Sequence, residues 1–202
     1  MEAIVFRSFD IGWLGVAEAP RWLTFGRPGV YLDSTIPSYA CSARSRDALI
    51  ARRQRITRIW WDRYRRDYEL LISDRVTEEV SIGAPVFARQ RLSLIRSIRS
   101  LACEPHHFAL VELLLRPGIL PMKAKADAQH IATAAYNSVR ILLTWNCKHL
   151  ANPIIARKVA QTCEAHGLEC PLICTPETLM RIYSHERSNH PSDSRDPSSV
   201  FD

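Results

Sequence analysis

Apolar residues follow two alternating patterns along most of this chain, short apolar runs and longer stretches with helical spacing. The short runs predict β-strands at residues 30–33, 68–72, 139–144 and 172–174. The helical spacing predicts helices at about residues 46–67, 75–82, 85–99, 106–116, 123–136, 153–166 and 176–183. Because strands alternate with helices, we expect an α/β fold with three layers, α/β/α, and a central, mostly parallel sheet.

The two ends of the chain lack these patterns. Residues 1–29 show no sustained period, so we interpret them as a loosely ordered N-terminal extension. Residues 184–202 are rich in Ser, Pro, Asp and His and contain little apolar surface to bury, so we expect a disordered tail. The sequence therefore predicts one folded domain at residues 30–183.

Composition adds only broad limits. The formal net charge of +6 favours an anionic partner, and no apolar run approaches the length needed to cross a bilayer. The first twenty residues lack the ordered regions of a signal peptide, so we expect a cytoplasmic protein that does not bind membranes. The six cysteines form no C-x-x-C pair and are expected to be reduced thiols. Phosphate-binding glycine loops, the G-x-S-x-G motif and zinc-ligand spacings are not present in the sequence.

Polar side chains follow three of the predicted strands. Asp33 ends the first strand, and Asn146 lies two residues beyond Thr144, which ends the strand at 139–144. Glu79 lies about one helical turn after the strand at 68–72. Because ligands bind at the carboxyl ends of parallel strands, we expect these side chains to share one site.

Two acidic side chains are predicted to point toward the interior from helices. Glu79 lies beside the apolar stripe that contains Val76, whereas Glu78 is expected to face water. Asp127 borders the apolar face of the helix at 123–136. An acid directed toward a core is costly unless it is paired, neutralised or bound to a metal.

The candidate metal ligands are the carboxylates of Asp33, Glu79 and Asp127 with the amide oxygen of Asn146. Hard divalent cations take such oxygen ligands, and Mg²⁺ commonly keeps several waters as well. In the alternative interpretation, each acid caps a helix or pairs with one of the many arginines. Ser73 or Asp74 is also expected to cap the helix at 75–82 through its side-chain oxygen.

Six segments resemble, in the same order, the VapC-like branch of the PIN-domain family. They are residues 30–39, 57–61, 76–80, 125–132, 143–150 and 173–177, with the sequences VYLDSTIPSY, TRIWW, VTEEV, KADAQHIA, LTWNCKHL and ICTPE. The resemblance covers about residues 30–180 and implies a PIN-like fold. Each segment alone has moderate specificity, whereas the ordered set is a stronger signal.

The resemblance implies a metal-dependent endoribonuclease, usually the toxin of a type II toxin–antitoxin pair, that cuts single-stranded or structured RNA. The implied catalytic and metal-binding residues are Asp33, Glu79, Asp127 and Asn146, and the ion is Mg²⁺ or Mn²⁺. Three side chains are expected to support the site, namely Ser34, Thr144 and His130. The implied partners are the RNA substrate, a cognate antitoxin and a second copy in a homodimer.

The chain departs from many PIN domains at Asn146, where they have Asp. An amide adds no negative charge, so we expect weaker metal binding than in a site with four carboxylates. This departure supports an alternative, a PIN-fold module that acts by binding protein or RNA with little catalysis. The segments do not distinguish RNA from DNA, so DNA cleavage is a third alternative.

Arginines are densest in residues 44–66. We expect contact with RNA phosphates or with an acidic antitoxin segment at Arg52, Arg53 and Arg55, against the alternative of a solvated helix face. The apolar positions of this helix are predicted at Leu49, Ile50, Ile56, Ile59 and Trp60. Trp60 and Trp61 are interpreted as core or dimer contacts, and Glu112 as a reserve acid.

Overall fold

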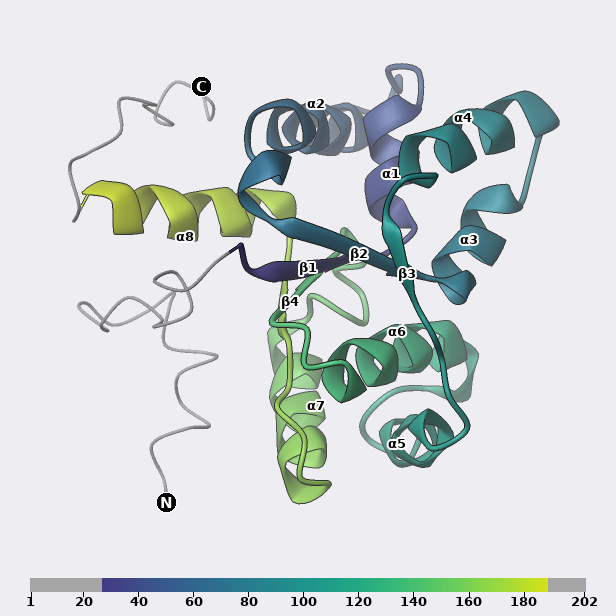
Figure 1. The fold of residues 1–202 in the computed structure, drawn as a ribbon, viewed down its shortest axis with the longest axis vertical. Coiled ribbons are helices and arrows are strands. Elements are labelled where there is room, and N and C mark those ends of the chain that lie inside the picture. Colours follow the sequence, from purple (N-terminus) through teal and green to yellow (C-terminus); the bar gives the residue numbers. More distant parts are fainter. Residues whose placement is uncertain (1–26, 189–202) are drawn as a thin grey trace.

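The structure, a computed structural model, describes residues 27–188 and has a parallel sheet at its centre (Figure 1). The five strands lie in the order β3-β2-β1-β4-β5, and every pairing is parallel. Their bounds are Gly29–Leu32 for β1, Glu69–Ser73 for β2, Arg99–Leu101 for β3, Ile141–Leu143 for β4 and Leu172–Cys174 for β5.

Helices cover both faces of the sheet. The α-helices are α1 (Thr35–Cys41), α2 (Ala48–Arg63), α3 (Asp74–Ser81), α4 (Pro85–Ile95), α5 (His107–Leu114), α6 (Lys125–Tyr136), α7 (Pro153–Ala165) and α8 (Pro176–Ser188). Short 3-10 helices span Arg65–Asp67 and Met122–Ala124. Figure 1 shows α1, α2 and α4 on one side of the sheet and α5, α6 and α7 on the other, which confirms the predicted three-layer α/β/α fold.

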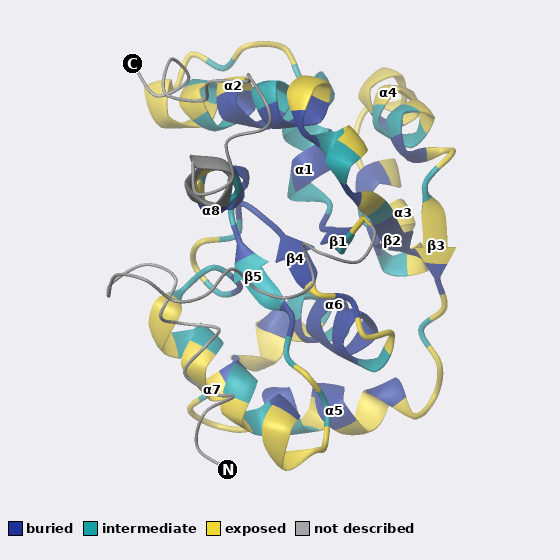
Figure 2. Ribbon diagram, turned by 60° about the vertical axis from the view of Figure 1, so that its left-hand side comes forward, coloured by how far each residue is buried: buried dark blue, intermediate teal, exposed yellow. Residues whose placement is uncertain are grey.

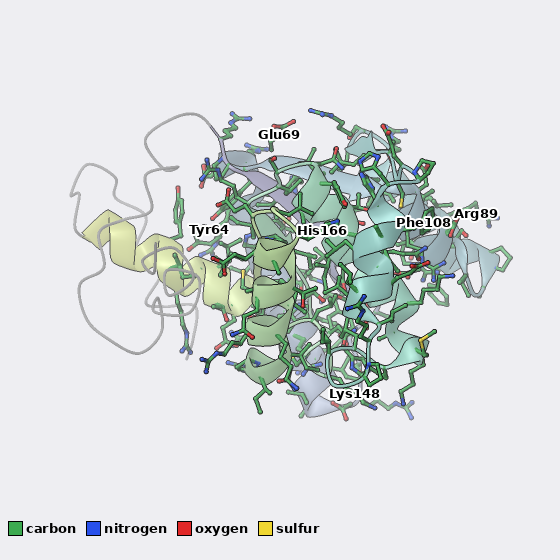
Figure 3. All side chains as sticks on the ribbon, turned by 90° about the horizontal axis from the view of Figure 1, so that it is seen from below. Tyr64, Glu69, Arg89, Phe108, Lys148 and His166 are labelled. Carbon is green, nitrogen blue, oxygen red and sulfur yellow. The ribbon has the colours of Figure 1, made fainter. Side chains whose placement is uncertain are left out.

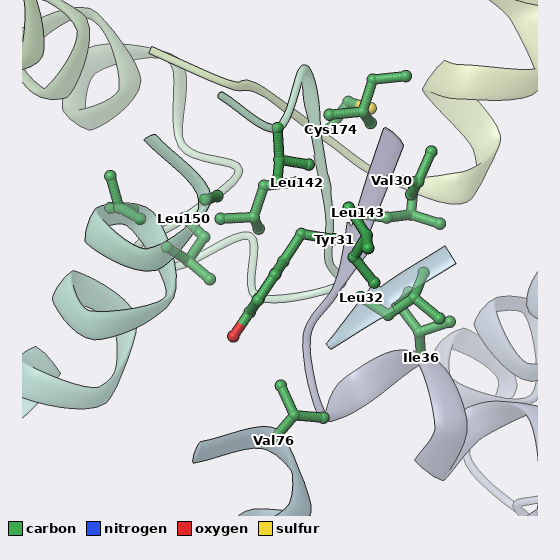
Figure 4. Packing of buried hydrophobic residues seen from close by; sticks show 14 of the residues in the cluster. Val30, Tyr31, Leu32, Ile36, Val76, Leu142, Leu143, Leu150 and Cys174 are labelled. Carbon is green, nitrogen blue, oxygen red and sulfur yellow. The ribbon is translucent and has the colours of Figure 1, made fainter. Parts of the chain in front are cut away.

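The core is built around the central strand β1. Val30, Tyr31 and Leu32 are fully buried, as expected for a parallel strand covered on both faces. Figure 2 shows the same burial at β1, β4 and the inner side of α6. In Figure 4 the Tyr31 ring leaves the packing around Leu142, and its hydroxyl points toward the side where Val76 lies. Exposed charged residues such as Glu69, Arg89 and Lys148 lie around the outside in Figure 3.

Two elements are present that the pattern did not predict. Helix α1 occupies a segment interpreted as a turn because of its proline. Pro37 lies in the first turn of this helix, where a backbone N–H has no intrahelical acceptor, so the proline is tolerated. Strand β3 is a three-residue edge strand with only Leu101 buried, which is too short to produce a periodic signal.

The helix predicted at 46–67 is shorter than expected, and its predicted apolar face is buried only in part: Ile56 and Trp60 are in the core and Ile59 packs against it. It ends at Arg63, and Leu49 and Ile50 are 56% and 36% exposed rather than buried. Gln54 is also buried, and it accepts a hydrogen bond from the Ser45 N–H and donates to Ser42 Oγ and the Ala43 carbonyl. Trp60 and Trp61 belong to the core, as one of the two interpretations held.

The predicted N-terminal extension and C-terminal tail lie mostly outside the described residues. Strand β1 begins at Gly29, and residues 1–26 of the predicted extension lie outside the described residues. Helix α8 continues to Ser188, so the start of the segment predicted as a disordered tail is helical, and residues 189–202 lie outside the described residues. The six cysteines are free, as expected. Within residues 27–188, no helix has both the length and the apolar composition to span a membrane.

Candidate functional site

The polar residues predicted to share a site lie at the carboxyl edge of the sheet. The register pairs Leu32 of β1 with Leu143 of β4, so Asp33 and Thr144 follow at neighbouring positions. The Asp33 N–H donates to the Leu143 carbonyl at 3.1 Å and extends this pairing by one residue. Helices α3 and α6 follow different strands of the sheet and contact each other, so Glu79 and Asp127 approach the site from two separate elements.

Asp33 is a buried carboxylate held by hydroxyl and amide groups. The residue is only 3% exposed. Its Oδ1 accepts hydrogen bonds from the Thr35 N–H at 2.9 Å and from the Thr35 hydroxyl. Oδ2 accepts from Thr144 Oγ1 at 2.6 Å. Burial raises the pKa of Asp33, and the charge of His130 and these hydrogen bonds lower it in part. No ion pair to Asp33 occurs among the described residues, so its charge is not offset by a direct basic contact.

A hydrogen-bonded chain connects Asp33 to Asp127. Thr144 Oγ1, which donates to Asp33, accepts from the Asn146 N–H at 2.9 Å. The Asn146 side-chain amide then donates from Nδ2 to Asp127 Oδ1 at 3.0 Å. Because the strand end and the following loop supply these donors, β4 sets the relative positions of the two acids.

The orientation of the Asn146 amide is specific. Its oxygen, the predicted metal ligand, accepts from the His149 N–H at 3.2 Å, and its nitrogen faces Asp127. In this orientation Asn146 holds Asp127 in place. A ligand role for Asn146 Oδ1 requires the amide group to turn, and it stays a prediction.

Asp127 is half-buried on α6 and has one uncommitted oxygen. Oδ1 accepts from Asn146, whereas Oδ2 has no hydrogen-bond donor within the described part of the chain. Burial raises the pKa of Asp127, the charges of His130 and His149 and the Asn146 hydrogen bond lower it, and the nearby Glu79 raises it. Oδ2 is therefore available to a cation or to water.

Glu79 faces inward, whereas its neighbour Glu78 is exposed, as predicted: their side chains are 19% and 66% exposed. Glu79 Oε1 accepts from Arg75 Nε at 3.0 Å, and Oε2 lies 3.3 Å from His130 Nε2. Burial raises the pKa of Glu79, but hydrogen bonds from His130 and Ser34 and the charges of His130 and Arg75 outweigh it and lower the pKa to about 2. The predicted supporting residue Ser34 thus contacts Glu79.

His130 lies between the acids. It is 2% exposed, contacts Glu79 through Nε2, and its charge also lowers the pKa of Asp33 and of Asp127 against the effect of their burial. Its Nδ1 lies 2.8 Å from the hydroxyl of Tyr31. The three predicted acids and the predicted supporting histidine are therefore within electrostatic reach of one another.

Sequence reasoning missed Tyr31 and assigned Ser73 another role. Tyr31 lies two residues before Asp33, so both side chains leave the chain on the same side, which was the available signal. Ser73 was expected as a possible helix cap, but it makes no side-chain capping bond in α3, and Asp74 is the first residue of that helix. Ser73 Oγ instead lies 2.6 Å from the Tyr31 hydroxyl.

The three selected arginines have different surroundings. Arg52 donates to both carboxylate oxygens of Glu177 at 2.9 Å, whereas the Arg53 guanidinium lies 5.5 Å from the ring centre of Trp145. Arg55 contributes to a surface hollow of about 720 Å³. The hollow is lined by Arg44, Ala48, Ala51, Arg52, Arg55, Arg58, Ile59, Asp62 and Arg63. Because Trp145 lies between Thr144 and Asn146 in the chain, Arg53 is the one of the three that contacts the loop of the candidate site.

The donor set suits a hydrated divalent ion. Asp33 and Asp127 offer carboxylate oxygens, burial raises the pKa of both, and neither forms an ion pair with a described residue. A nearby cation would offset this unfavourable burial. No group of three or more His, Cys, Asp or Glu residues forms a ready ligand cage in the range 27–188. Mg²⁺ commonly uses only one or two protein carboxylates beside waters, so the residues fit it. The reserve acid Glu112 is exposed on α5 and is no part of this site.

No protein-family model, curated protein or solved structure matched this chain. The resemblance to PIN domains therefore depends on the sequence segments alone.

Proposed function

We propose that this protein is a divalent-metal-dependent nuclease that hydrolyses phosphodiester bonds in RNA. The observation that carries the proposal is the linked pair of acids at the carboxyl edge of the sheet. Asp33 and Asp127 come from different layers, are joined through Thr144 and Asn146, and have no basic side chain in ion-pair contact within the described residues. Paired carboxylates of this kind commonly bind a cation.

Each residue has a defined task in this proposal. Asp33 and the free oxygen of Asp127 would hold Mg²⁺ or Mn²⁺ with Glu79 as the third carboxylate, while Thr144 and Asn146 orient Asp33 and Asp127. When bound, such an ion lowers the pKa of a water molecule and offsets charge on the phosphate. In-line attack of water on phosphorus with cleavage of the bond to the 3′ oxygen leaves 5′-phosphate and 3′-hydroxyl ends.

The charge of the protein supports a nucleic-acid substrate. The net charge is +6, and Arg53 places a cation beside the loop that carries Asn146. Arginine forms bidentate hydrogen bonds with phosphate, so Arg53 is the residue best placed to contact the strand next to the cleaved bond. The arginine-lined hollow on α2 fits an acidic segment such as that of an antitoxin. The antitoxin and a homodimer stay predictions from the resemblance.

The test is cleavage of a mixed RNA pool by the full chain in Mn²⁺, Mg²⁺ or EDTA. We expect cleavage with either metal, none in EDTA, and none for Asp127→Asn in any buffer. Glu112→Gln, which neutralises an exposed acid of α5, is the matched control and is expected to cleave like the wild type. Cleavage that persists in Asp127→Asn would contradict the assignment of the site, and equal cleavage of DNA would correct the substrate.

A second candidate function is a binding module without efficient catalysis. It is favoured by the Asn146 amide, which satisfies Asp127 Oδ1 without a metal, and by Glu79, which is already bonded to Arg75 and His130. Calorimetric titration with Mn²⁺ distinguishes the two. Sub-millimolar binding that Asp127→Asn abolishes would count against the module, whereas no binding by the wild type would support it.

A further inference from the structure

The hydroxyl of Tyr31 is the centre of a buried polar chain beneath the candidate site. It lies 2.6 Å from Ser73 Oγ and 2.8 Å from His130 Nδ1, both within normal hydrogen-bond range. Tyr31 and Ser73 have no exposed surface, and His130 is 2% exposed. Buried polar chains of this kind hold their members rigidly when every group is satisfied, as it is here.

The chain of hydrogen bonds has a direction. Glu79 as a carboxylate only accepts, so His130 Nε2, 3.3 Å from its Oε2, donates to it. In the neutral imidazole, Nδ1 then accepts from the Tyr31 hydroxyl, and the Tyr31 oxygen accepts from Ser73. In neutral His130, the contacts with Glu79 and with the Tyr31 hydroxyl therefore favour the same tautomer, in which Nε2 carries the proton and donates to Glu79.

Three residues of this chain lie on or next to the elements that carry the three acids, and the fourth, Ser73, ends β2. Tyr31 precedes Asp33 on β1, His130 follows Asp127 by about one turn of α6, and Glu79 itself lies on α3. A hydrogen-bonded chain across these elements sets the position of Glu79 relative to the other two carboxylates. Helices α3 and α6 contact each other, so this chain acts where the two elements meet.

Glu79 has a competing partner on the surface. Arg75 donates from Nε to Glu79 at 3.0 Å and from an Nη to the exposed Glu78 at 3.2 Å, and its side chain is 38% exposed. Without the bond from His130, only Ser34 would oppose Arg75, which would draw the Glu79 carboxylate toward itself and solvent. The buried histidine thus opposes an outward pull along the same helix.

We propose that Tyr31 and His130 are positioning residues that hold Glu79 inward, toward Asp33 and Asp127, for divalent-metal binding. This inference rests on the proposed function, because it concerns the same site. Groups that orient metal-binding carboxylates typically change metal affinity about 10- to 100-fold when they are removed. Tyr31 need not contact the ion or the RNA to have this effect.

The experiment is Mn²⁺ titration of the full chain by calorimetry, with the thermal unfolding midpoint of each variant measured in EDTA. Tyr31→Phe removes one buried oxygen and keeps the ring. The matched control is Tyr136→Phe, which removes the hydroxyl of another tyrosine bonded to a histidine: Tyr136 Oη lies 2.9 Å from His166 Nε2, on the part of α6 away from the acids. Asp127→Asn is the reference for loss of a ligand.

We expect Tyr31→Phe to weaken Mn²⁺ binding about 10-fold or more and Tyr136→Phe to leave it unchanged. A second pair tests His130. We expect His130→Gln, which keeps an N–H donor for Glu79, to bind Mn²⁺ more tightly than His130→Leu, which has none. This rescue by a conservative variant distinguishes positioning from a general loss of packing, and it applies even if Tyr31→Phe does not fold.

The outcomes separate the two proposals. Wild-type affinity in Tyr31→Phe together with loss in Asp127→Asn would overturn the positioning role and leave the metal site standing. Equal weakening in the Gln and Leu variants of His130 would also overturn it. No Mn²⁺ binding by the wild type would overturn both the metal site and the role of Tyr31.

Discussion

The hydroxyl of Thr144 offers a sharp test of how the candidate site is held together. Thr144 is fully buried, donates to Asp33 Oδ2 at 2.6 Å and accepts from the Asn146 N–H at 2.9 Å. Thr144→Val replaces this hydroxyl with a methyl group of similar size. The variant therefore removes both hydrogen bonds with little change in packing volume.

The expected cost follows from the two groups left without partners. A hydrogen bond to a charged group contributes about 1.5–3 kcal/mol, and a partly buried N–H without an acceptor costs about 1 kcal/mol. We therefore expect Thr144→Val to lower the free energy of unfolding by about 3 kcal/mol. Loss of the bond also moves the pKa of Asp33 further upward, the direction in which burial already shifts it.

Urea denaturation in EDTA measures this loss. With an m value of about 2 kcal/mol/M, the midpoint should fall by about 1.5 M at unchanged m. Thr162→Val is the control, because it makes the same change at an exposed hydroxyl that donates to the Lys158 carbonyl on α7. It should cost about 0.5 kcal/mol or less. A loss below about 1 kcal/mol in Thr144→Val would refute the idea that Thr144 supports a buried, charged acid.

Four further results are expected. Asp127→Asn removes the repulsion with Glu79 and keeps Oδ1 as the acceptor for Asn146, so in EDTA the variant should melt at or above the wild-type temperature. With Mn²⁺ at a hundred times Kd, only the wild type should gain stability, by about 2.7 kcal/mol. A lower melting temperature of the variant in EDTA would contradict this. Asn146→Asp places a second carboxylate against Asp127, so it should lower the melting temperature in EDTA and tighten Mn²⁺ binding about 10-fold in calorimetry. Unchanged Mn²⁺ affinity would argue against a metal between these two side chains. The hydrogen bond from Arg52 and nearby arginine charge lower the pKa of Glu177 against the effect of burial. The ionised carboxylate therefore stabilises the fold fully above the unfolded pKa of about 4.3, and this contribution is lost as pH falls through the lowered folded pKa. Melting curves from pH 6 to 3 should show a smaller acid-induced loss of stability in Glu177→Gln than in the wild type and in the control Glu112→Gln. Arg53→Ala should weaken RNA binding and reduce the slope of log affinity against log salt by about 1, whereas Arg89→Ala, at an exposed position of α4, should bind RNA like the wild type in a filter or anisotropy assay.

Most of the fold could be predicted because helical and strand periodicity are local properties of the chain. The pattern around Val76 and Val80 placed Glu79 inward and Glu78 in water, and both positions are confirmed. The same reasoning was wrong for Leu49 and Ile50, which lie on the same side of α2 as the buried Ile56 and Trp60 but in its first turn, where they are exposed. Periodicity identifies the buried side of a helix but not how far the core extends along it.

The sequence by itself determined the parallel α/β architecture and the gathering of Asp33, Glu79, Asp127 and Asn146 at one edge, because apolar spacing sets the elements and parallel strands end together. Only the tertiary structure decided how the polar atoms are paired. Tyr31 and His130 are 99 residues apart in the chain and Thr144 and Asp33 are 111 apart, yet each pair is joined by a hydrogen bond. Hydrogen bonds depend on distances of a few tenths of an ångström and on direction, and neither is encoded in the spacing of residue types.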